Sequence, residues 1–211
     1  MGSAGDDDLP FGHGDVYVAV VMGVGATEDQ VEAIFDELDR QLDEDHVESL
    51  EVRMAGPKLA TLTTGGDLQD SHRLAEDLVT AYADDEILSY EHGGSYVSVR
   101  LSTEDFDDVV AAADRYGDAG DPDSIFVAAN RFRLDRGDGD EDPGLTAART
   151  RFVQRVDDEI PLTGAVVSSY EPLELWTARK HRDELRAVLA GDPDAQWLGT
   201  VVTRSRSAPW P

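Results

Sequence analysis

The order in which strand-like and helix-like segments follow one another most constrains how this chain can fold. Val16–Met22 is an apolar run of the length of a strand. Thr27–Asp43 comes next and places its apolar residues at the spacing of one helical face, with acidic residues on the other side. The apolar residues of that face are Val31, Ile34, Phe35, Leu38 and Leu42. The chain therefore opens with a strand followed by an amphipathic helix.

The next segments extend this order. Residues 47–54 and 58–64 alternate in part and flank Ala55-Gly-Pro57, which predicts a β-hairpin. Residues 68–83 have the spacing of a second helix, and residues 87–91 form a short strand pattern. The resulting order, β-α-β-β-α-β, predicts an α+β protein with the ferredoxin-like plan, in which two helices cover one face of an antiparallel sheet.

The second half of the sequence can be interpreted as the same plan with an insertion. The inserted piece, residues 135–158, is an acidic loop over 135–144 followed by a helix over 145–158. Two tandem copies of the plan are one interpretation, and a single mixed α/β domain with a longer sheet is the alternative. The other predicted elements are strands at 95–101, 125–134, 164–170, 173–177 and 197–203 and helices at 103–116 and 180–190.

Composition supports four segments along the chain. Residues 1–15 are small, acidic and interrupted by Pro10 and glycines, so we expect a mobile acidic arm. Residues 16–94 would form the ferredoxin-like domain and residues 95–206 the second α/β half. Residues 207–211 are predicted to form an extended tail.

The chain carries 45 acidic and 18 basic residues, a formal net charge of −27, with only two lysines. This composition resembles that of proteins from halophiles that accumulate salt, because molar salt screens the repulsion of a carboxylate shell. An acidic protein from a GC-rich genome is the alternative. Residues 16–26, the longest apolar run, are too short to cross a membrane. We therefore expect a protein of the halophile cytoplasm or a virion component, without a membrane partner.

Charge is distributed unevenly. Residues 1–144 contain 36 acidic and 9 basic residues, whereas residues 145–211 contain nine of each. If an acidic coat keeps exposed surface hydrated in brine, the neutral last third should be covered by its own chain, another copy or a partner. The predicted partner-binding residues are eight basic residues of this third and one tryptophan: Arg151, Arg155, Arg179, Lys180, Arg182, Arg186, Arg204, Arg206 and Trp210.

Arginine suits an interface because its guanidinium forms paired hydrogen bonds to carboxylates. The same arginines could instead pair with acidic residues of their own chain. Nine cations balanced by nine anions make no basic stripe, so a nucleic-acid partner is not expected. A homo-oligomer or a protein complex is the expected assembly.

The glycines after the first strand are predicted to form a turn and not a nucleotide pocket. A dinucleotide-binding fingerprint would continue Gly23-Val-Gly25 with a glycine at position 28, where this chain has Glu28 followed by Asp29. Two carboxylates in a first helical turn would repel a phosphate. Thr27 and Gln30 have the spacing of a capping box instead.

No catalytic, cofactor-binding or metal-ligating residue is predicted. Cysteine is absent, and the five histidines lack metal-ligand spacing. We expect His72 to pack at the apolar edge of its helix. The run Asp138–Gly144 resembles the start of a calcium loop, but Pro143 and Arg149 occupy the positions of the required glycine and glutamate.

The sequence therefore favours a non-enzymatic structural or interaction subunit of a halophilic protein assembly, such as a ring, a virion connector or a multiprotein complex. Its neutral last third would contact the partner. The alternative is a small-molecule-binding or enzymatic ferredoxin-like domain with a pocket between sheet and helices.

Overall fold

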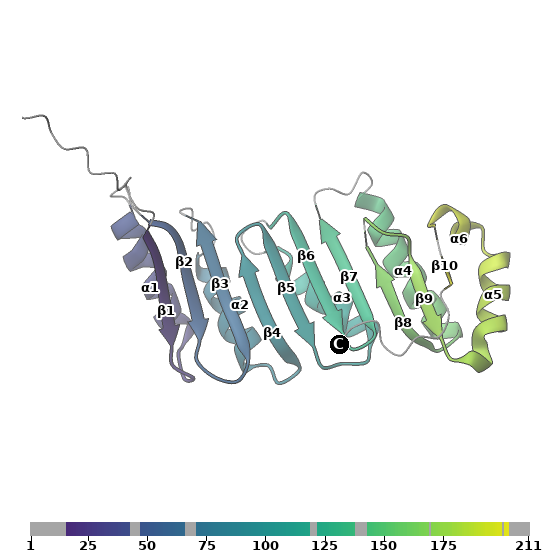
Figure 1. Cartoon of the computed structure of the whole chain (residues 1–211), viewed down its shortest axis with the longest axis horizontal. Coiled ribbons are helices and arrows are strands. Elements are labelled where there is room, and N and C mark those ends of the chain that lie inside the picture. The colour runs from purple at the N-terminus through teal and green to yellow at the C-terminus, as the bar shows by residue number, and fades with distance from the viewer. Residues whose placement is uncertain are drawn as a thin grey trace, which may run out of the picture.

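A computed structural model describes residues 16–42, 47–65, 71–118, 122–137, 143–168, 170–199 and 201–202. They form one ten-stranded mixed sheet with α-helices packed on it (Figure 1). The strands are β1 (Val16–Met22), β2 (Val47–Met54), β3 (Leu59–Gly65), β4 (Ile87–Gly93), β5 (Tyr96–Leu101), β6 (Ser124–Ala129), β7 (Phe132–Gly137), β8 (Leu162–Val167), β9 (Glu174–Thr177) and β10 (Val201–Val202). The helices are α1 (Glu28–Leu42), α2 (Ser71–Ala83), α3 (Phe106–Tyr116), α4 (Pro143–Glu159), a 3₁₀ turn (Arg179–His181), α5 (Arg182–Gly191) and α6 (Pro193–Trp197).

The strands lie in the sheet in the order in which they occur in the chain. Strands joined through a helix are parallel, as β1 and β2 are, and strands joined by a hairpin are antiparallel, as β2 and β3 are. The sheet is therefore a row of five βαβ units that are connected by hairpins. No strand lies between the parallel pair β1 and β2, so the split βαβ arrangement of a ferredoxin-like domain is not confirmed. The α+β class and a single large mixed sheet are what the structure shows.

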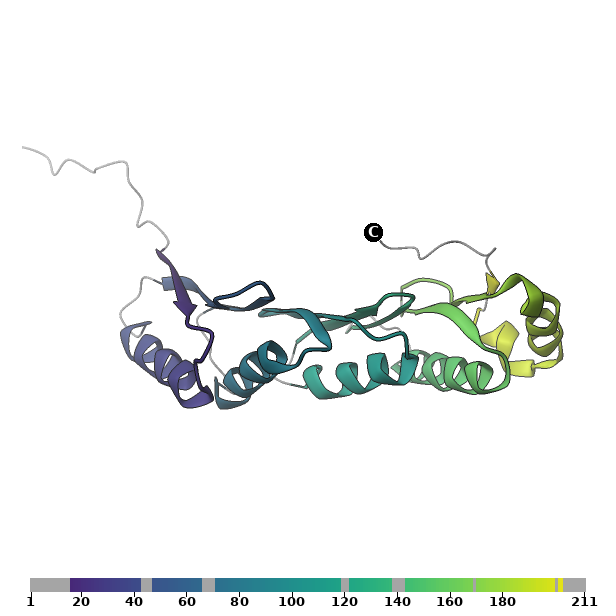
Figure 2. The same cartoon turned by 90° about the horizontal axis from the view of Figure 1, so that it is seen from below.

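Helices α1 to α4 cover the same face of the sheet (Figure 2). Strand direction reverses from one βαβ unit to the next, because each hairpin turns the chain around. If the direction reverses while the helix stays on one face, successive crossovers must have opposite hand. Left-handed crossovers are rare in proteins, so this alternation is an unusual property of the topology. Its consequence is a layer of helices on one face of the sheet and none of α1 to α4 on the other.

Alternation along the strands separates the two faces. In β5, Val97, Val99 and Leu101 are buried toward the helices, whereas Ser98 is half-buried and Arg100 exposed on the other face. The helical layer fills its side with side chains such as Leu78 of α2 and Phe106 of α3. Each fully buried side chain of this size contributes about 1.5–3 kcal/mol, so the strand–helix interface is the main stabilising layer.

The loops at the start of the chain confirm the predicted turns. The Ala26 amide donates to the Gly23 carbonyl at 2.9 Å, which closes a turn after β1. The Thr27 amide donates to Oε1 of Gln30 at 3.1 Å, as a capping box requires. Gly56 has φ +149°, a conformation that favours glycine, in the hairpin between β2 and β3.

Two sequence predictions for the second half are wrong. The strand predicted over 125–134 is a hairpin, since β6 ends at Ala129 and β7 begins at Phe132. Residue Asp135 was expected in an acidic loop, but it lies in β7 and is fully buried. With β7 in place, α4 is the crossover between the parallel strands β7 and β8 and not an insertion.

The C-terminal boundaries also differ. The last predicted strand began at Trp197, but Pro193–Trp197 forms α6, and β10 comprises only Val201–Val202. The sheet continues from β4 to β5 across the boundary predicted between residues 94 and 95, and the division into domains stays a prediction. The arm at 1–15 and the tail at 207–211 lie outside the described residues. Within the described ranges, no helix has the length and apolar character that a membrane crossing requires.

Candidate interaction surface

A groove lies where α4 meets α6, and we call it the C-terminal groove. Its volume is about 490 Å³. Helix α4 supplies one wall with residues spaced three and four apart, which places them on one helical face. Helix α6 and the residue after it supply the other wall. The groove is lined by Gly144, Ala148, Arg151, Phe152, Arg155, Asp194, Trp197 and Leu198.

Two of the predicted partner-binding arginines line this groove. Arg155 forms an ion pair with Asp192 at 2.6 Å, and its guanidinium lies 5.1 Å from the centroid of the Phe152 ring. Arg151 is exposed, and within the described part of the chain it has no ion pair. Because Arg155 is already neutralised, Arg151 is the cation that the described lining of the groove offers to an acidic ligand.

The other functional feature of the groove is an exposed indole. Trp197 is 62% exposed at the end of α6. Helix α6 is fixed by an N-cap, in which the Asp192 carboxylate accepts a hydrogen bond from the Asp194 amide at 2.8 Å, and by Pro193 at its first turn. Asp192 therefore both caps α6 and pairs with Arg155, which holds the two walls of the groove together.

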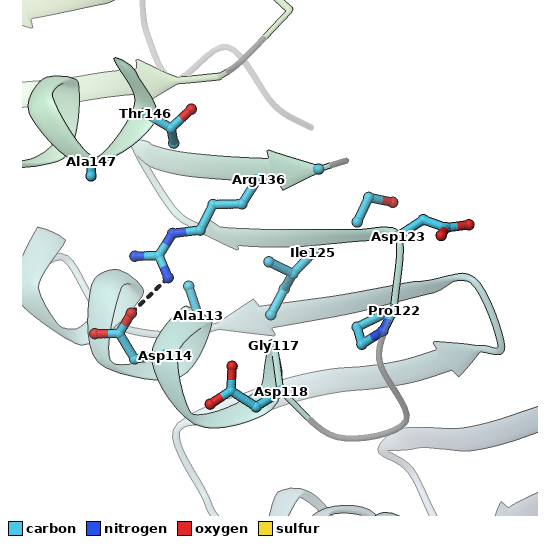
Figure 3. A pocket seen from close by; sticks show the side chains of 12 residues that line it. Ala113, Asp114, Gly117, Asp118, Pro122, Asp123, Ile125, Arg136, Thr146 and Ala147 are labelled. Atoms are coloured by element: carbon cyan, nitrogen blue, oxygen red, sulfur yellow. Dashed lines mark hydrogen bonds and ion pairs between the residues drawn. The ribbon is translucent and has the colours of Figure 1, made fainter. Parts of the chain in front are cut away.

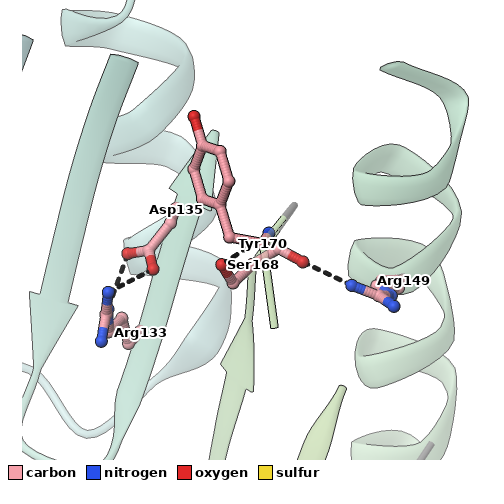
Figure 4. A network of polar contacts seen from close by, with 5 residues as sticks. All are labelled: Arg133, Asp135, Arg149, Ser168 and Tyr170. Carbon is pink, nitrogen blue, oxygen red and sulfur yellow. Dashed lines mark hydrogen bonds and ion pairs between the residues drawn. The ribbon is translucent and has the colours of Figure 1, made fainter. Parts of the chain in front are cut away.

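A buried arginine that the sequence analysis did not select holds this end of the molecule. Arg149 of α4 is 7% exposed, and its guanidinium donates to the carbonyls of Leu198 at 3.0 Å and Glu171 at 2.8 Å. It also donates to the carbonyl of Ser168 (Figure 4). Two backbone segments, the β8–β9 connection at Ser168 and Glu171 and the end of α6 at Leu198, thus converge on one side chain. Arg149 therefore has a structural role: it links α4 to these carbonyls, and it does not line the groove.

The remaining predicted cations do not line the C-terminal groove. Arg179 and Lys180 are exposed on the 3₁₀ turn, and Arg182 is half-buried at the start of α5. Arg186 is 62% exposed and lies 3.5 Å from Asp183. These four lie on the 3₁₀ turn and α5, where Asp183 and Glu184 are exposed as well. Residues Arg204, Arg206 and Trp210 lie outside the described residues.

A second cavity, of about 540 Å³, opens between α3, the β6–β7 hairpin and the start of α4 (Figure 3). Its arginine, Arg136, pairs with Asp114 at 2.6 Å, and its other charged side chains are Asp118 and Asp123. A cavity whose cation is neutralised and whose other charges are acidic offers little to an anionic ligand. Among its described lining residues, this cavity does not bring together the set of polar groups that would mark a reactive site.

Two buried aspartates, Asp135 and Asp77, have a raised pKa. Asp135 faces away from the helices and pairs with Arg133, whose Nε donates to it at 2.7 Å (Figure 4). Burial raises the pKa of Asp135, and the Arg133 guanidinium opposes that shift. Asp77 of α2 is 2% exposed, and burial raises its pKa to about 6, against the fields of Arg73 and Arg115. Its Oδ2 and the hydroxyl of Tyr90 have no hydrogen-bond partner among the described residues.

The described part of the chain offers no cluster of metal-ligating side chains. In the described ranges, no group of three histidine, aspartate or glutamate side chains could hold a metal ion. The expectation for His72 is wrong, because its side chain is 67% exposed and lies 3.3 Å from Glu32 and 3.4 Å from Glu28. Most of the calcium-like run Asp138–Gly144 lies outside the described residues.

Comparison with known proteins returns no relative. No protein-family model matches the chain, and neither a curated protein nor a solved structure is significantly similar to it.

Proposed function

We propose that this protein is a non-enzymatic structural or interaction subunit of a halophilic protein assembly, and that it contacts a partner protein through the C-terminal groove. The observation that carries the proposal is the exposed Trp197 beside Arg151 in a groove of the charge-neutral third. Tryptophan and arginine dominate the binding energy of protein interfaces. In a chain of net charge −27, an exposed indole beside an available guanidinium stands out from the acidic surface.

The chemistry of the groove defines the kind of partner. An acidic side chain can accept paired hydrogen bonds from Arg151, and an adjacent apolar side chain can pack on the Trp197 indole. Such a contact retains most of its apolar contribution in molar salt, where the Debye length falls to about 3 Å and the charge contribution weakens. The proposed setting is the cytoplasm of a halophile or a virion, in a ring, a connector or a multiprotein complex.

The test measures the mass of the purified full-length chain, with any protein that remains bound, by light scattering in molar salt. We expect a mass above the 23.0 kDa of one chain. Trp197→Ala and Arg151→Glu should each weaken the association about tenfold or more, because each removes one half of the proposed contact. A wild-type mass of 23.0 kDa at every concentration would overturn the proposal.

Matched controls separate the groove from general effects of charge and aromatic surface. Arg53→Glu makes the same charge change on the other face of the sheet, where Arg53 pairs with Glu51 at 2.7 Å. Tyr170→Ala removes another aromatic side chain, which is 57% exposed outside the groove. Association that is weakened equally by the controls and by the groove variants would contradict the assignment.

A further inference from the structure

Strand β1 ends the sheet on one side, and β2 is the one described strand that it pairs with (Figure 1). Among the described residues, no strand pairs with its outer edge. An edge strand presents unpaired backbone amides and carbonyls, which pair readily with another strand. Proteins usually protect such an edge with a charged residue, a proline or a covering element. Strand β1 is seven residues long and contains neither a charged residue nor a proline.

A groove next to this edge is lined by uncharged residues. Val21 is 67% exposed on β1, and Val24 is 69% exposed in the turn that follows. A groove of about 550 Å³ runs from the end of β1 to α1, and not one of its lining residues is charged. On the α1 side it is lined by Gln30, Ala33 and Ile34. An uncharged strip across strand and helix is conspicuous in a chain with 45 acidic residues.

The opposite edge of the sheet is protected. Strand β10 has only two residues, and α5 lies outside it at that end of the molecule in both views (Figures 1 and 2). A second copy therefore cannot extend the sheet in a head-to-tail manner through a strand of comparable length. The matching uncharged strand edge that the described part of a second copy presents is its own β1.

We propose that the protein forms a homodimer in which the β1 strands of two copies pair antiparallel across a two-fold axis perpendicular to the sheet. This axis keeps the helices of both copies on the same face and joins the two sheets into one. Pairing of the two β1 edges satisfies unpaired backbone groups of both copies, and the seven residues of β1 bring no carboxylate into the contact. The proposal concerns a different surface from the C-terminal groove and does not depend on it.

The dimer should depend on salt in a defined direction. Pairing of the β1 strands brings the two α1 helices together on one face, and each begins with Glu28 and Asp29 and carries further acidic residues such as Asp36. Their repulsion opposes association in dilute buffer and is screened in molar salt. The dimer should therefore form in molar salt and dissociate as the salt concentration falls.

Sedimentation equilibrium of the full-length chain in molar salt tests the proposal. We expect a monomer–dimer equilibrium that Val21→Lys weakens at least tenfold, because it places a charge on each edge strand at the seam. Val24→Lys makes the same change at a position of nearly equal exposure just outside the strand, and it should change the equilibrium less than about twofold. Trp197→Ala, which weakens the proposed groove contact, should still form the β1 dimer, so the two interfaces are tested separately.

Amide hydrogen exchange gives a readout that does not depend on a variant that might misfold. The β1 amides that point away from β2 should become more protected as protein concentration rises in molar salt. A monomer at every concentration would overturn the proposal. Protection of residues 16–22 that is independent of concentration would also overturn it, since it would mean that the chain covers its own edge. Equal weakening by Val21→Lys and Val24→Lys would do the same.

Discussion

The two ends of the sheet are built from the same kind of βαβ unit, but the edge strands and the elements next to them differ. At the C-terminal end, the buried guanidinium of Arg149 binds three backbone carbonyls, and α5 lies outside a two-residue edge strand. At the N-terminal end, no described strand covers the seven-residue edge strand, and the contact between α1 and α2 includes the exposed His72 and the half-buried Glu32. The comparison shows that, among the described residues, the outer strand at each end has one paired edge, and that the elements around these two strands differ.

The largest expected effect comes from removing the Arg149 side chain at the C-terminal end. Arg149→Ala leaves three carbonyls without their donor, so we expect the free energy of unfolding to fall by about 2–4 kcal/mol. Denaturant unfolding in molar salt measures the loss, and amide exchange should place it in α4 to α6. Arg151→Ala, two residues along the same helix but exposed, should stay within about 0.5 kcal/mol. Equal losses for both variants would show that Arg149 does not have this structural role.

A smaller effect is expected from the unpaired carboxylate of Asp77, in the N-terminal half. Burial raises its pKa to about 6, so the folded chain binds this proton more tightly than the unfolded chain, whose aspartates titrate near 4. The free energy of unfolding should therefore decrease as pH rises from about 4 through about 6. Asp77→Asn keeps the shape without the charge, and above pH 6 it should be more stable than the wild type by up to about 3 kcal/mol.

The control for this prediction is Glu76→Gln, which removes an exposed carboxylate one residue away. It should leave the pH dependence between about 4 and 6 in place, whereas Asp77→Asn should reduce it. A pH profile of Asp77→Asn that is parallel to that of the wild type would show that Asp77 is not the group that titrates.

The smallest effect concerns the surface contact between α1 and α2. The hydrogen bond and charge of Glu32, helped by Glu28, raise the pKa of His72 above its usual 6.5. The stabilisation from the charged pair is therefore present at low pH and is lost as pH rises through the folded-state pKa. An NMR titration in low salt should show the raised pKa, and Glu32→Gln should bring it back toward 6.5. A His72 pKa that is insensitive to Glu32→Gln would contradict this contact.

Local patterns predicted most elements of the fold but not their arrangement. The alternating strands, the amphipathic helices and the Thr27–Gln30 capping box follow from neighbouring residues, and the structure has them. The order of the strands could not be read in this way, because the same β-α-β-β-α-β succession suits both a split βαβ sheet and a row of consecutive units. The β6–β7 hairpin could have been recognised from the spacing of apolar residues in the sequence. The buried positions are 125, 127 and 129 before Asn130 and 132 and 134 after it, a change of phase that marks a turn.

The candidate surface was predicted only in part. Arg151 and Arg155 line one groove, as their spacing on a helix suggested, but Trp197 was assigned to a strand and therefore missed. Arg149 was missed because its residue type is the same as that of its exposed neighbours. Its position was informative, since it shares a helical face with Phe152, Val153 and Val156, all buried. The backbone carbonyls that it binds come from segments distant in sequence, and no local pattern could identify them.

The consecutive order of the strands also bears on how the chain folds. Each strand pairs with the strand before or after it in the sequence, so the segment that must close before a pair forms is a single hairpin or a single crossover, however wide the whole sheet becomes. Units made first by the ribosome can complete their pairing before the last ones are synthesised. Adding or removing a terminal unit would then change the width of the molecule without changing the pathway by which the rest assembles.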